Sequence, residues 1–309
     1  MSSVSQTNRK YHVPVMLEEC LEALQVTPGG TYVDVTFGGG GHSRALFDRL
    51  DGIGKLISFD QDPDALKNTW EAGNFHFVQA NFAFYHNHLR LLGVKAVDGV
   101  LADLGVSSHQ FDEEGRGFSI HGDAPLDMRM NQSGDLTAAR ILNEYNEASL
   151  ANVLWQYGEV KNSKKLAAHI ISSRASQKIK TTSQFVELAQ GLAPKHKEHK
   201  YFAQVFQALR IEVNDEMGAL KNFLEQSIKA IKPRGRLVVM SYHSLEDRLV
   251  KNFMKRGSFT GEIEKDFFGN VLKPFKEIVR HPIIPTDEEI EENSRARSAK
   301  LRIAERNGE

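Results

Sequence analysis

YVDVTFGGGGHS, residues 32–43, joins a strand-like run to a glycine loop and carries the clearest structural signal in the chain. Its first half is rich in β-branched and aromatic residues, which are typical of a strand in a packed sheet. The glycines at positions 38–41 permit positive φ angles and a close approach of the backbone to a ligand. An amphipathic segment follows, so we predict a strand, a ligand-binding loop and a helix that begins at the loop.

Three further strand-like runs follow, with helix-like segments between them: KLISFD at 55–60, FHFVQ at 75–79 and VDGVLA at 97–102. The dipeptide Asp62-Pro63 favours a helix start, because Asp caps a helix well and Pro is tolerated in the first turn. Strands that alternate with helices predict right-handed βαβ units and a parallel sheet with helices on both faces.

The alternation stops after the fourth strand. From Ser108 to Arg210 the apolar residues follow helical spacing, and no convincing strand is found. A helical pattern over 213–231 then ends at a turn, 232–235, and we expect a strand at 236–241. The remaining strand-like runs, which we expect to pair with each other, are 275–280 and 299–304.

We therefore predict an α/β fold with a doubly wound, mostly parallel, seven-stranded Rossmann-like sheet and an inserted helical domain. Residues 1–107 and 211–309 form the discontinuous sheet domain, which binds the cofactor. Residues 108–210 form the helical insert.

The overall composition excludes several classes of protein. The 309 residues include 39 Lys and Arg against 40 Asp and Glu, so the chain is neither a uniformly basic nucleic-acid coat protein nor an acidic disordered protein. Its single cysteine, Cys20, excludes a disulfide framework and a Cys-rich zinc site. The first ten residues lack the apolar core of a signal peptide, and no apolar run approaches the ~20 residues that cross a bilayer. We expect a cytoplasmic protein that has no membrane partner.

Positive charge is concentrated in the predicted insert. Between residues 161 and 200, nine Lys and Arg residues stand against two Glu residues. Further basic residues near the end of the chain are Arg295, Arg297, Lys300, Arg302 and Arg306. Such clusters are typical of phosphate-backbone binding, although a solvated helix face has a similar composition. We therefore expect the insert to recognise a nucleic-acid substrate.

Two acidic residues near the glycine loop indicate which ligand it binds. Asp60 ends the second strand run, where an acidic residue hydrogen-bonds ribose hydroxyls in nucleotide-binding folds. Asp34 stands at the start of the loop. The loop is not a clean G-x-G-x-x-G, because Ser43 takes the place of the last glycine, and no Lys follows as in a phosphate-binding loop. S-adenosylmethionine, with an ammonium group, ribose hydroxyls and no phosphate, suits these acids. A tight glycine turn beside an unrelated Asp is the alternative.

Asp103 ends the fourth strand run and is the first candidate for chemistry. It lies in ADLGVSSHQ, beside the expected reversal of strand order, where reacting groups collect. A carboxylate there can orient a methionine moiety or accept a hydrogen bond from an amine substrate. Ser and His residues stand nearby, but the G-x-S-x-G elbow of a hydrolase is absent from the sequence.

SYHSLEDR, residues 241–248, follows the fifth strand run. Ser244 is a reasonable helix N-cap with Asp247 three residues later, and His243 would then face the same crevice as Asp103. A catalytic His243 and a plain capping segment with an exposed His fit this spacing equally well. The other histidines lack partners at metal-ligand spacing, so no metal site is predicted.

Short specific motifs run in register from His12 to Arg306. They are HVPVML, DVTFGGGGHS, FDQDP, VLADLGVSSHQFD, RGFS, PLDMRM, FQALRIEVNDE, SYHSLEDRLVK and SRARSAKLRIAER. Together they closely resemble the small-subunit ribosomal RNA methyltransferase H family (RsmH, also called MraW).

The resemblance implies a methyltransferase sheet, S-adenosylmethionine as cofactor, and methylation of the N4 amine of a cytidine in the decoding region of 16S rRNA, in the small ribosomal subunit. It also implies a homodimer, for which the sequence itself gives no argument. The cofactor contacts of the family fall on Gly40, Gly41, His42, Asp60, Phe82, Asp103 and Gln110 of this sequence.

We hypothesise that Asp103 and the Ser107–Gln110 loop lie next to both the methyl donor and the base, and that His243 assists proton loss or binds the base. Three alternatives stay open. They are an NAD-dependent oxidoreductase on the same sheet, a non-catalytic RNA-binding or assembly protein, and a methyltransferase of DNA or protein.

Overall fold

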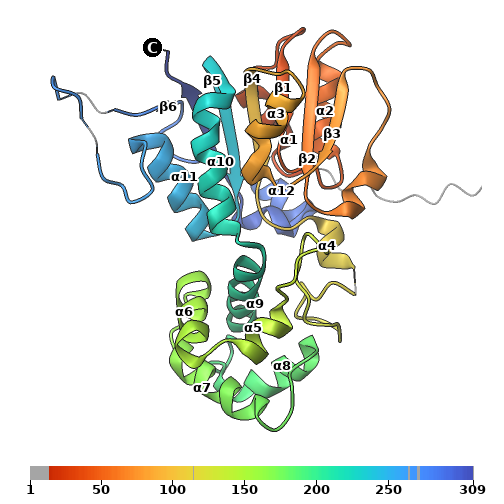
Figure 1. Ribbon diagram of the computed structural model, residues 1–309, viewed down its shortest axis with the longest axis vertical. Helices are drawn as coiled ribbons and strands as arrows, with labels where there is room; N and C mark the ends of the chain where they lie inside the picture. Colours follow the sequence, from red (N-terminus) through yellow and green to blue (C-terminus); the bar gives the residue numbers. More distant parts are fainter. Residues whose placement is uncertain (1–13, 114, 264, 270–271, 309) are drawn as a thin grey trace, which may run out of the picture.

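The computed structural model describes residues 14–113, 115–263, 265–269 and 272–308, and it contains the predicted seven-stranded sheet (Figure 1). The strands are β1 (Thr31–Asp34), β2 (Lys55–Asp60), β3 (Phe75–Gln79), β4 (Val97–Asp103), β5 (Ile231–Ser241), β6 (Phe275–Glu277) and β7 (Lys300–Arg306). Their order is β3-β2-β1-β4-β5-β7-β6; β1 to β5 are parallel, and β7 is antiparallel to both its neighbours. The predicted doubly wound, mostly parallel sheet is confirmed.

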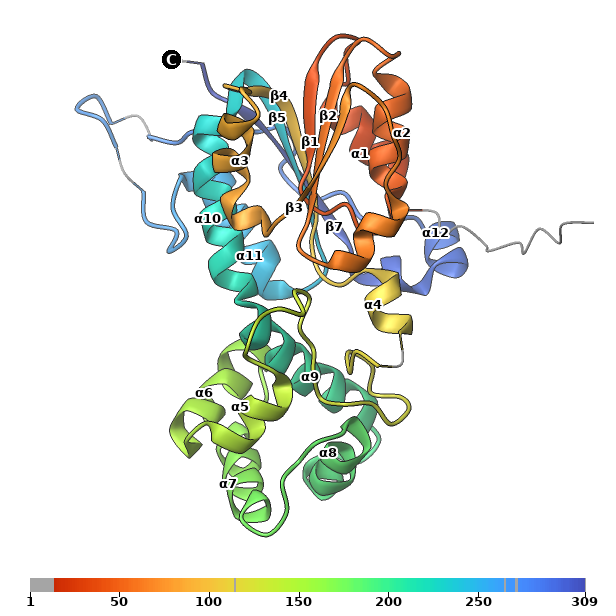
Figure 2. The same cartoon turned by 45° about the vertical axis from the view of Figure 1, so that its right-hand side comes forward.

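Helices cover both faces of this sheet (Figure 2). One face carries α1 (Leu17–Leu24) and α2 (Gly41–Arg49), and the other carries α3 (Tyr85–Leu91), α10 (Glu216–Ala230) and α11 (Ser244–Arg256). Successive residues of β1 pack on opposite faces, since Tyr32 joins the α1 and α2 cluster and Val33 joins the α3 and α10 cluster. A strand covered on both faces needs apolar side chains at consecutive positions, which explains its near-continuous apolar sequence.

Shorter elements complete the sheet domain. They are the 3₁₀ helices η1 (Pro63–Asn68), η2 (Phe82–Phe84) and η4 (Ser294–Ser298) and the α-helix α12 (Asp287–Glu292). The predicted helix start at Asp62-Pro63 is confirmed, although the helix is 3₁₀, and the Asp62 side chain accepts the N–H of Asp64 at 3.1 Å. Among the residues that the structure describes, no helix has the length and apolar character to cross a bilayer.

A second group of helices has its own hydrophobic core and lies below the sheet in Figure 1. It comprises α5 (Ala138–Glu144), α6 (Glu147–Gly158), α7 (Ser163–Arg174), α8 (Thr182–Ala189), η3 (Gln190–Leu192) and α9 (Glu198–Asn214), and α4 (Ser108–Asp112) leads toward it. Between 108 and 210, the described residues form no strand beyond a bridge between Pro125 and Thr181. We propose that this group of helices is the predicted insert. The expected end of the insert, between residues 210 and 211, falls within α9.

The structure corrects the start of α11. The N-cap is His243 rather than Ser244: its Nδ1 accepts the N–H of Glu246 at 3.4 Å, and the Glu246 carboxylate accepts the N–H of His243 at 3.4 Å. An imidazole nitrogen thus takes the place of the usual Ser or Asp oxygen, and Glu246 rather than Asp247 completes the capping box.

The turn predicted at 232–235 lies inside β5 as a bulge. The register moves from Val97 opposite Ile231 to Gly99 opposite Arg236, so Asp98 alone faces the four residues 232–235, three more than an unbroken register would place there. Beyond the bulge, β5 pairs with β4 without interruption as far as Met240. The bulge therefore leaves the carboxyl end of β5 in register with the carboxyl end of β4.

The last long strand, β7, returns antiparallel beside β5, with Lys300 paired to Ser241. The first residue of β7 therefore lies where β5 ends. The carboxyl ends of the parallel strands share this edge, so the antiparallel return brings the basic segment 295–300 to the same edge as Asp60 and Asp103.

Candidate active site

The glycine loop is hydrogen-bonded to Asp60 through Gly38 and is open at Gly39. Gly38 and Gly40 have φ of 50° and 78°, which glycine adopts without the clash of a Cβ. Gly38 donates its N–H to Asp60 Oδ2 at 2.7 Å. A Cβ built on Gly39 would meet no atom within 4 Å. The loop therefore presents its backbone to open space at Gly39, as a cradle for a ligand requires.

Asp34 does not take part in this cradle. It is 1% exposed, and its carboxylate accepts the Ser43 hydroxyl at 2.6 Å and the Thr36 N–H at 3.0 Å. The expectation that Asp34 is one of two acids that meet the ligand is therefore wrong. Its carboxylate ties the end of β1 to the first turn of α2 beneath the loop.

Asp60 is the last residue of β2, and its side chain faces the backbone of the glycine loop. Besides Gly38, it accepts the N–H of Asp62 at 2.8 Å through Oδ1. Burial raises the pKa of Asp60 to about 6. The two backbone N–H groups oppose this effect, because they favour the carboxylate and lower the pKa. Each carboxylate oxygen accepts more than one hydrogen bond, so Asp60 retains capacity for ribose hydroxyls.

Asp103 ends β4, and its side chain remains 24% exposed. Its Oδ1 accepts the Tyr242 hydroxyl at 2.8 Å, and its Oδ2 lies 3.7 Å from His42 Nδ1. Burial raises the pKa of Asp103 to about 6, although His42 and the Tyr242 hydroxyl favour the charged form. Two neighbours thus fix the direction of a carboxylate that still reaches solvent.

His42 connects the loop to the start of the described chain. Its ring is buried, and Nε2 lies 3.0 Å from the carbonyl oxygen of Val15. Pro14 lies directly against Gly41, the residue before His42, since a Cβ on Gly41 would approach the Pro14 ring to 2.4 Å. Pro14 and Val15 of the HVPVML motif therefore pack against Gly41 and His42 at the end of the glycine loop, which the sequence alone did not reveal; His12 and Val13 lie outside the described residues.

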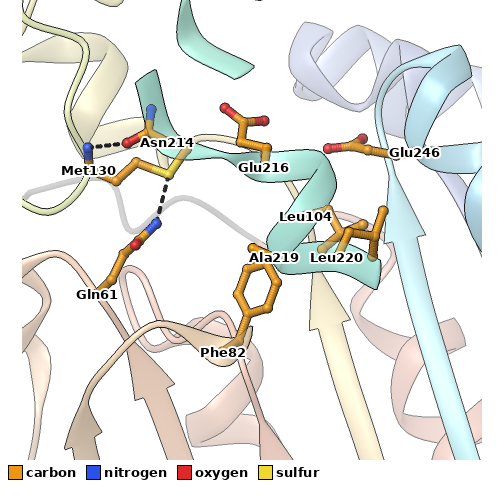
Figure 3. Close-up of a pocket in the computed structure, with 10 residues that line it drawn as sticks. Gln61, Phe82, Leu104, Met130, Asn214, Glu216, Ala219, Leu220 and Glu246 are labelled. Carbon is orange, nitrogen blue, oxygen red and sulfur yellow. Dashed lines mark hydrogen bonds between the residues drawn. The ribbon is translucent and has the colours of Figure 1, made fainter. Parts of the chain in front are cut away.

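A pocket opens between the carboxyl ends of the strands and the insert (Figure 3). Phe82 lines it from η2, held edge-on against Phe223 at a centroid distance of 5.7 Å. On the insert side, Asn214 accepts the Met130 N–H at 2.7 Å and donates to the Met128 carbonyl at 2.8 Å. The PLDMRM and FQALRIEVNDE motifs therefore build one wall of this pocket together.

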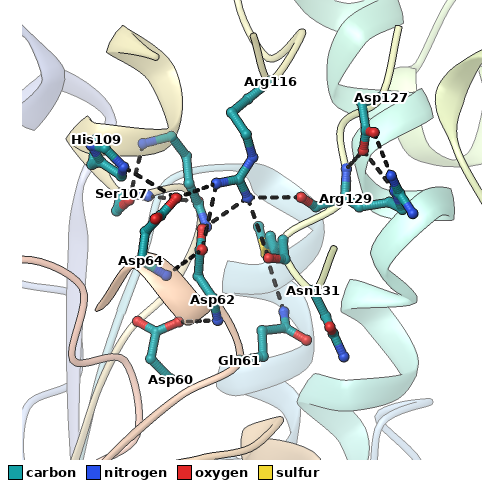
Figure 4. Close-up of polar contacts among 12 residues, drawn as sticks. Asp60, Gln61, Asp62, Asp64, Ser107, His109, Arg116, Asp127, Arg129 and Asn131 are labelled. Carbon is teal, nitrogen blue, oxygen red and sulfur yellow. Dashed lines mark hydrogen bonds and ion pairs between the residues drawn. The ribbon is translucent and has the colours of Figure 1, made fainter. Parts of the chain in front are cut away.

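Figure 4 shows the polar network around Asp62, Asp64 and Arg116, to which Gln110 also belongs. Its Nε2 donates to Asp62 Oδ2 at 2.7 Å, and Arg116 donates to the same oxygen at 2.9 Å. Arg116 also donates to Asp64 at 3.2 Å and to the carbonyl of Arg129 at 2.9 Å. Asp62 and Arg116 are both buried. This network joins the end of β2 to the loops leading into the insert. Arg116, the first residue of the RGFS motif, was not expected among the site residues.

His243 belongs to a buried charged cluster rather than to the contacts of Asp103. Its Nε2 lies 3.1 Å from Glu246 Oε1, and Arg210 donates to the nearby Glu216 at 2.8 Å. Ligand atoms of Glu216, His243 and Glu246 lie within 4.8 Å of one another. The Nδ1 of His243 accepts the capping N–H of Glu246 at 3.4 Å, so the imidazole serves as the cap of α11 within this cluster.

Gly40→Ala tests the conformation of the loop. A Cβ there would lie 2.9 Å from the ring of buried Phe37, at a φ of 78° that L side chains rarely adopt. We expect a loss of about 2–4 kcal/mol in the free energy of unfolding, from left-handed strain plus overpacking. Gly52→Ala, at φ of 70° with no atom within 4 Å, is the matched control for strain alone. Equal losses in urea unfolding of both variants would show that Phe37 does not confine the loop.

The doubly wound sheet, the glycine loop after β1 and the carboxylates that end β2 and β4 define a Rossmann-like methyltransferase. The sequence matches the model of the MraW methylase family over residues 9–307. This chain belongs to the MraW methylase family, and its methyl donor is S-adenosylmethionine.

Similar proteins named ribosomal RNA small subunit methyltransferase H occur in several bacteria. Those of Parabacteroides distasonis and Cytophaga hutchinsonii are each 56% identical over 96% of this chain, and the matches cover 97% and 99% of their own lengths. The protein of Flavobacterium johnsoniae is 54% identical over 97% of this chain and 99% of its own length.

Proposed function

We propose that this protein methylates the N4 amine of a cytidine in the decoding region of 16S rRNA, within the small ribosomal subunit. The observation that carries the proposal is Asp103, a directed and partly exposed carboxylate at the end of β4. The names of the relatives supply the class of substrate. A homodimer stays a prediction.

The residues of the loop edge fit the cofactor. When bound, S-adenosylmethionine supplies an electrophilic methyl group. We assign its adenosine to the cradle above the glycine loop, with Asp60 accepting the ribose hydroxyls and Phe82 packing against the ligand. The remaining proposed contacts are Gly40, Gly41, His42, Asp103 and Gln110, of which Gln110 acts through Asp62, to which it is bonded.

Asp103 prepares the amine for reaction. The N4 lone pair of cytosine is delocalised into the ring, so the amine is a poor nucleophile. A carboxylate that accepts one N4–H can hold the nitrogen toward the methyl group, and positioning of this kind contributes several kcal/mol to lowering the barrier. The same carboxylate takes the proton that the amine loses. We propose His243 as a second residue that contacts the base.

The insert offers the positive surface that an RNA substrate needs. Eight of the nine cations between 161 and 200 are exposed, whereas Arg174 is half-buried and donates to the carbonyl of Leu142 at 2.8 Å. The exposed ones are Lys161, Lys164, Lys165, Lys178, Lys180, Lys195, Lys197 and Lys200. We propose that they bind phosphates of the RNA and that the insert recognises the substrate.

Labelled S-adenosylmethionine, presented with naked 16S rRNA, with assembled 30S subunits and with DNA, tests the proposal. We expect label in RNA, located at N4 of a cytidine by nuclease digestion and mass spectrometry. Label only in DNA or protein would contradict the substrate. A titration with NAD in place of S-adenosylmethionine separates the oxidoreductase alternative, and RNA binding without methyl transfer would favour the non-catalytic one.

The pH dependence of the reaction follows from the raised pKa of Asp103. The carboxylate is the form that accepts the amine N–H, so kcat/KM for RNA at saturating S-adenosylmethionine should rise with pH through an apparent pKa near 6. Asp103→Asn should abolish this rise in whatever activity it retains. A flat wild-type profile between pH 5 and 8 would contradict the assignment.

The free energy of unfolding should depend on pH in the opposite direction and fall as the pH rises. Asp60 and Asp103 both have pKa values of about 6 in the folded chain, above the ordinary 3.8. Their contribution to the free energy of unfolding is therefore greatest below about pH 4 and is lost as the pH rises through 6.

A further inference from the structure

A second cavity lies at the same edge of the sheet, next to the pocket of Figure 3 but separate from it. Its volume is about 310 Å³, at the lower end of the range for small-molecule sites. Tyr242, His243 and Ser244 line one side, and residues of the segment 284–300 line the other. None of its lining residues also lines the pocket that holds Phe82 and Gly105.

The walls of this second cavity combine positive charge with apolar surface. Arg297 is exposed and makes no ion pair or hydrogen bond with the described residues. Lys300 lies 3.6 Å from Asp247, a carboxylate that it shares with Arg302, so its charge is only partly neutralised. Ile284, which is 65% exposed, and Ser298 line the same cavity. A guanidinium beside an apolar wall suits a phosphate joined to a planar base.

Tyr242 connects the second cavity to the reaction. It forms part of the cavity wall, and its hydroxyl donates to Asp103 at 2.8 Å. Only the Tyr242 side chain therefore separates a nucleotide in this cavity from the Asp103 carboxylate, which holds the target amine. Because the cavity shares no lining residue with the pocket of Phe82, it has room for a nucleotide other than the one that reacts.

We propose that the second cavity binds a nucleotide of the RNA that flanks the target cytidine, with its phosphate on Arg297 and its base against Ile284. This inference rests on the proposed function and adds a substrate subsite to it. The antiparallel return of β7 is what builds this subsite, because it places the segment 295–300 beside the end of β5.

Arg297→Ala in the full chain tests the phosphate contact. We expect the Kd for a short fluorescein-labelled single-stranded RNA from the 16S decoding region to rise roughly tenfold. The slope of log Kd against log salt should fall by about 0.7, the value for one phosphate in a single strand. Arg297→Lys should restore the slope and part of the affinity. Arg90→Ala, on an exposed residue at the end of α3, is the matched control.

Ser298→Leu tests the cavity itself, because it fills space without changing charge. We expect it to weaken RNA binding and to raise KM for RNA, with the Kd for S-adenosylmethionine unchanged. Ser294→Leu, exposed on the same short helix but outside the cavity, is its control.

The outcomes separate the two proposals. If the wild type binds and methylates RNA while Arg297→Ala and Ser298→Leu match it, the subsite is wrong and the methyltransferase function stands. If the wild type binds S-adenosylmethionine but neither binds nor methylates RNA, the proposed function fails, and the subsite fails with it.

Discussion

Asp103→Asn should reduce kcat for RNA methylation roughly 10²- to 10³-fold. The amide keeps the shape of the side chain and can still accept the Tyr242 hydroxyl, which donates to Asp103 at 2.8 Å in the wild type. It loses the negative charge that draws the amine N–H and the capacity to take a proton at neutral pH. Single-turnover kinetics with saturating S-adenosylmethionine measure the chemical step directly.

Two variants show whether such a loss belongs to Asp103 itself. Asp48→Asn makes the same charge change at an exposed position of α2 and should leave kcat unchanged. Tyr242→Phe removes the hydroxyl that directs Asp103 and should give a smaller loss, of roughly tenfold. Full methylation by Asp103→Asn, with normal affinity for S-adenosylmethionine, would show that another group holds the amine.

Arg116→Ala should have the largest effect on stability. The guanidinium bonds Asp62 at 2.9 Å and Asp64 at 3.2 Å, and Arg116 and Asp62 are 7% and 4% exposed. Removing one partner of a buried ion pair leaves an uncompensated charge, which costs about 3–5 kcal/mol. The variant should also weaken S-adenosylmethionine binding, because Asp62 positions Gln110 and donates its N–H to Asp60.

Arg140→Ala is the matched control within the insert. Arg140 pairs with Glu144 at 3.0 Å on the exposed face of α5, one helical turn away. Exposed pairs of this kind contribute little, so urea unfolding should be nearly unchanged. A comparable loss in both variants would mean that the Arg116 network is not a buried ion pair in solution. Double-mutant cycles of Arg116→Ala with Asp62→Asn then measure the coupling between the two side chains.

Much of the sheet could be predicted because its signals are local. β2 and β3 begin and end at the residues expected from their apolar runs, since Gly, Asn and Asp residues interrupt the chain on either side. The closing pair of β6 and β7 was also expected, from two strand-like runs near the end of the chain, and is confirmed. Alternation of strands and helices then leaves few topologies, because crossover connections are right-handed.

The side-chain directions at the site could not be predicted. Asp34 and Asp60 both end strands and bracket the same loop, yet Asp34 faces Ser43 in α2 while Asp60 faces the loop backbone. Position in the sequence does not distinguish these directions, because they depend on how α2 packs beneath the loop. The pairing of Arg116 with Asp62 spans 54 residues, and no periodic pattern reports such a contact.

The place of β7 in the sheet also has a consequence for synthesis of the chain. In the finished protein β5 lies between β4 and β7, but the ribosome makes residues 231–241 well before residues 300–306. During that interval β5 is the outermost strand, and its apolar run RLVVMS offers unpaired backbone groups to any other nascent strand. Chains that are released early should therefore aggregate, and chaperones that shield open strand edges should favour the yield of the complete enzyme.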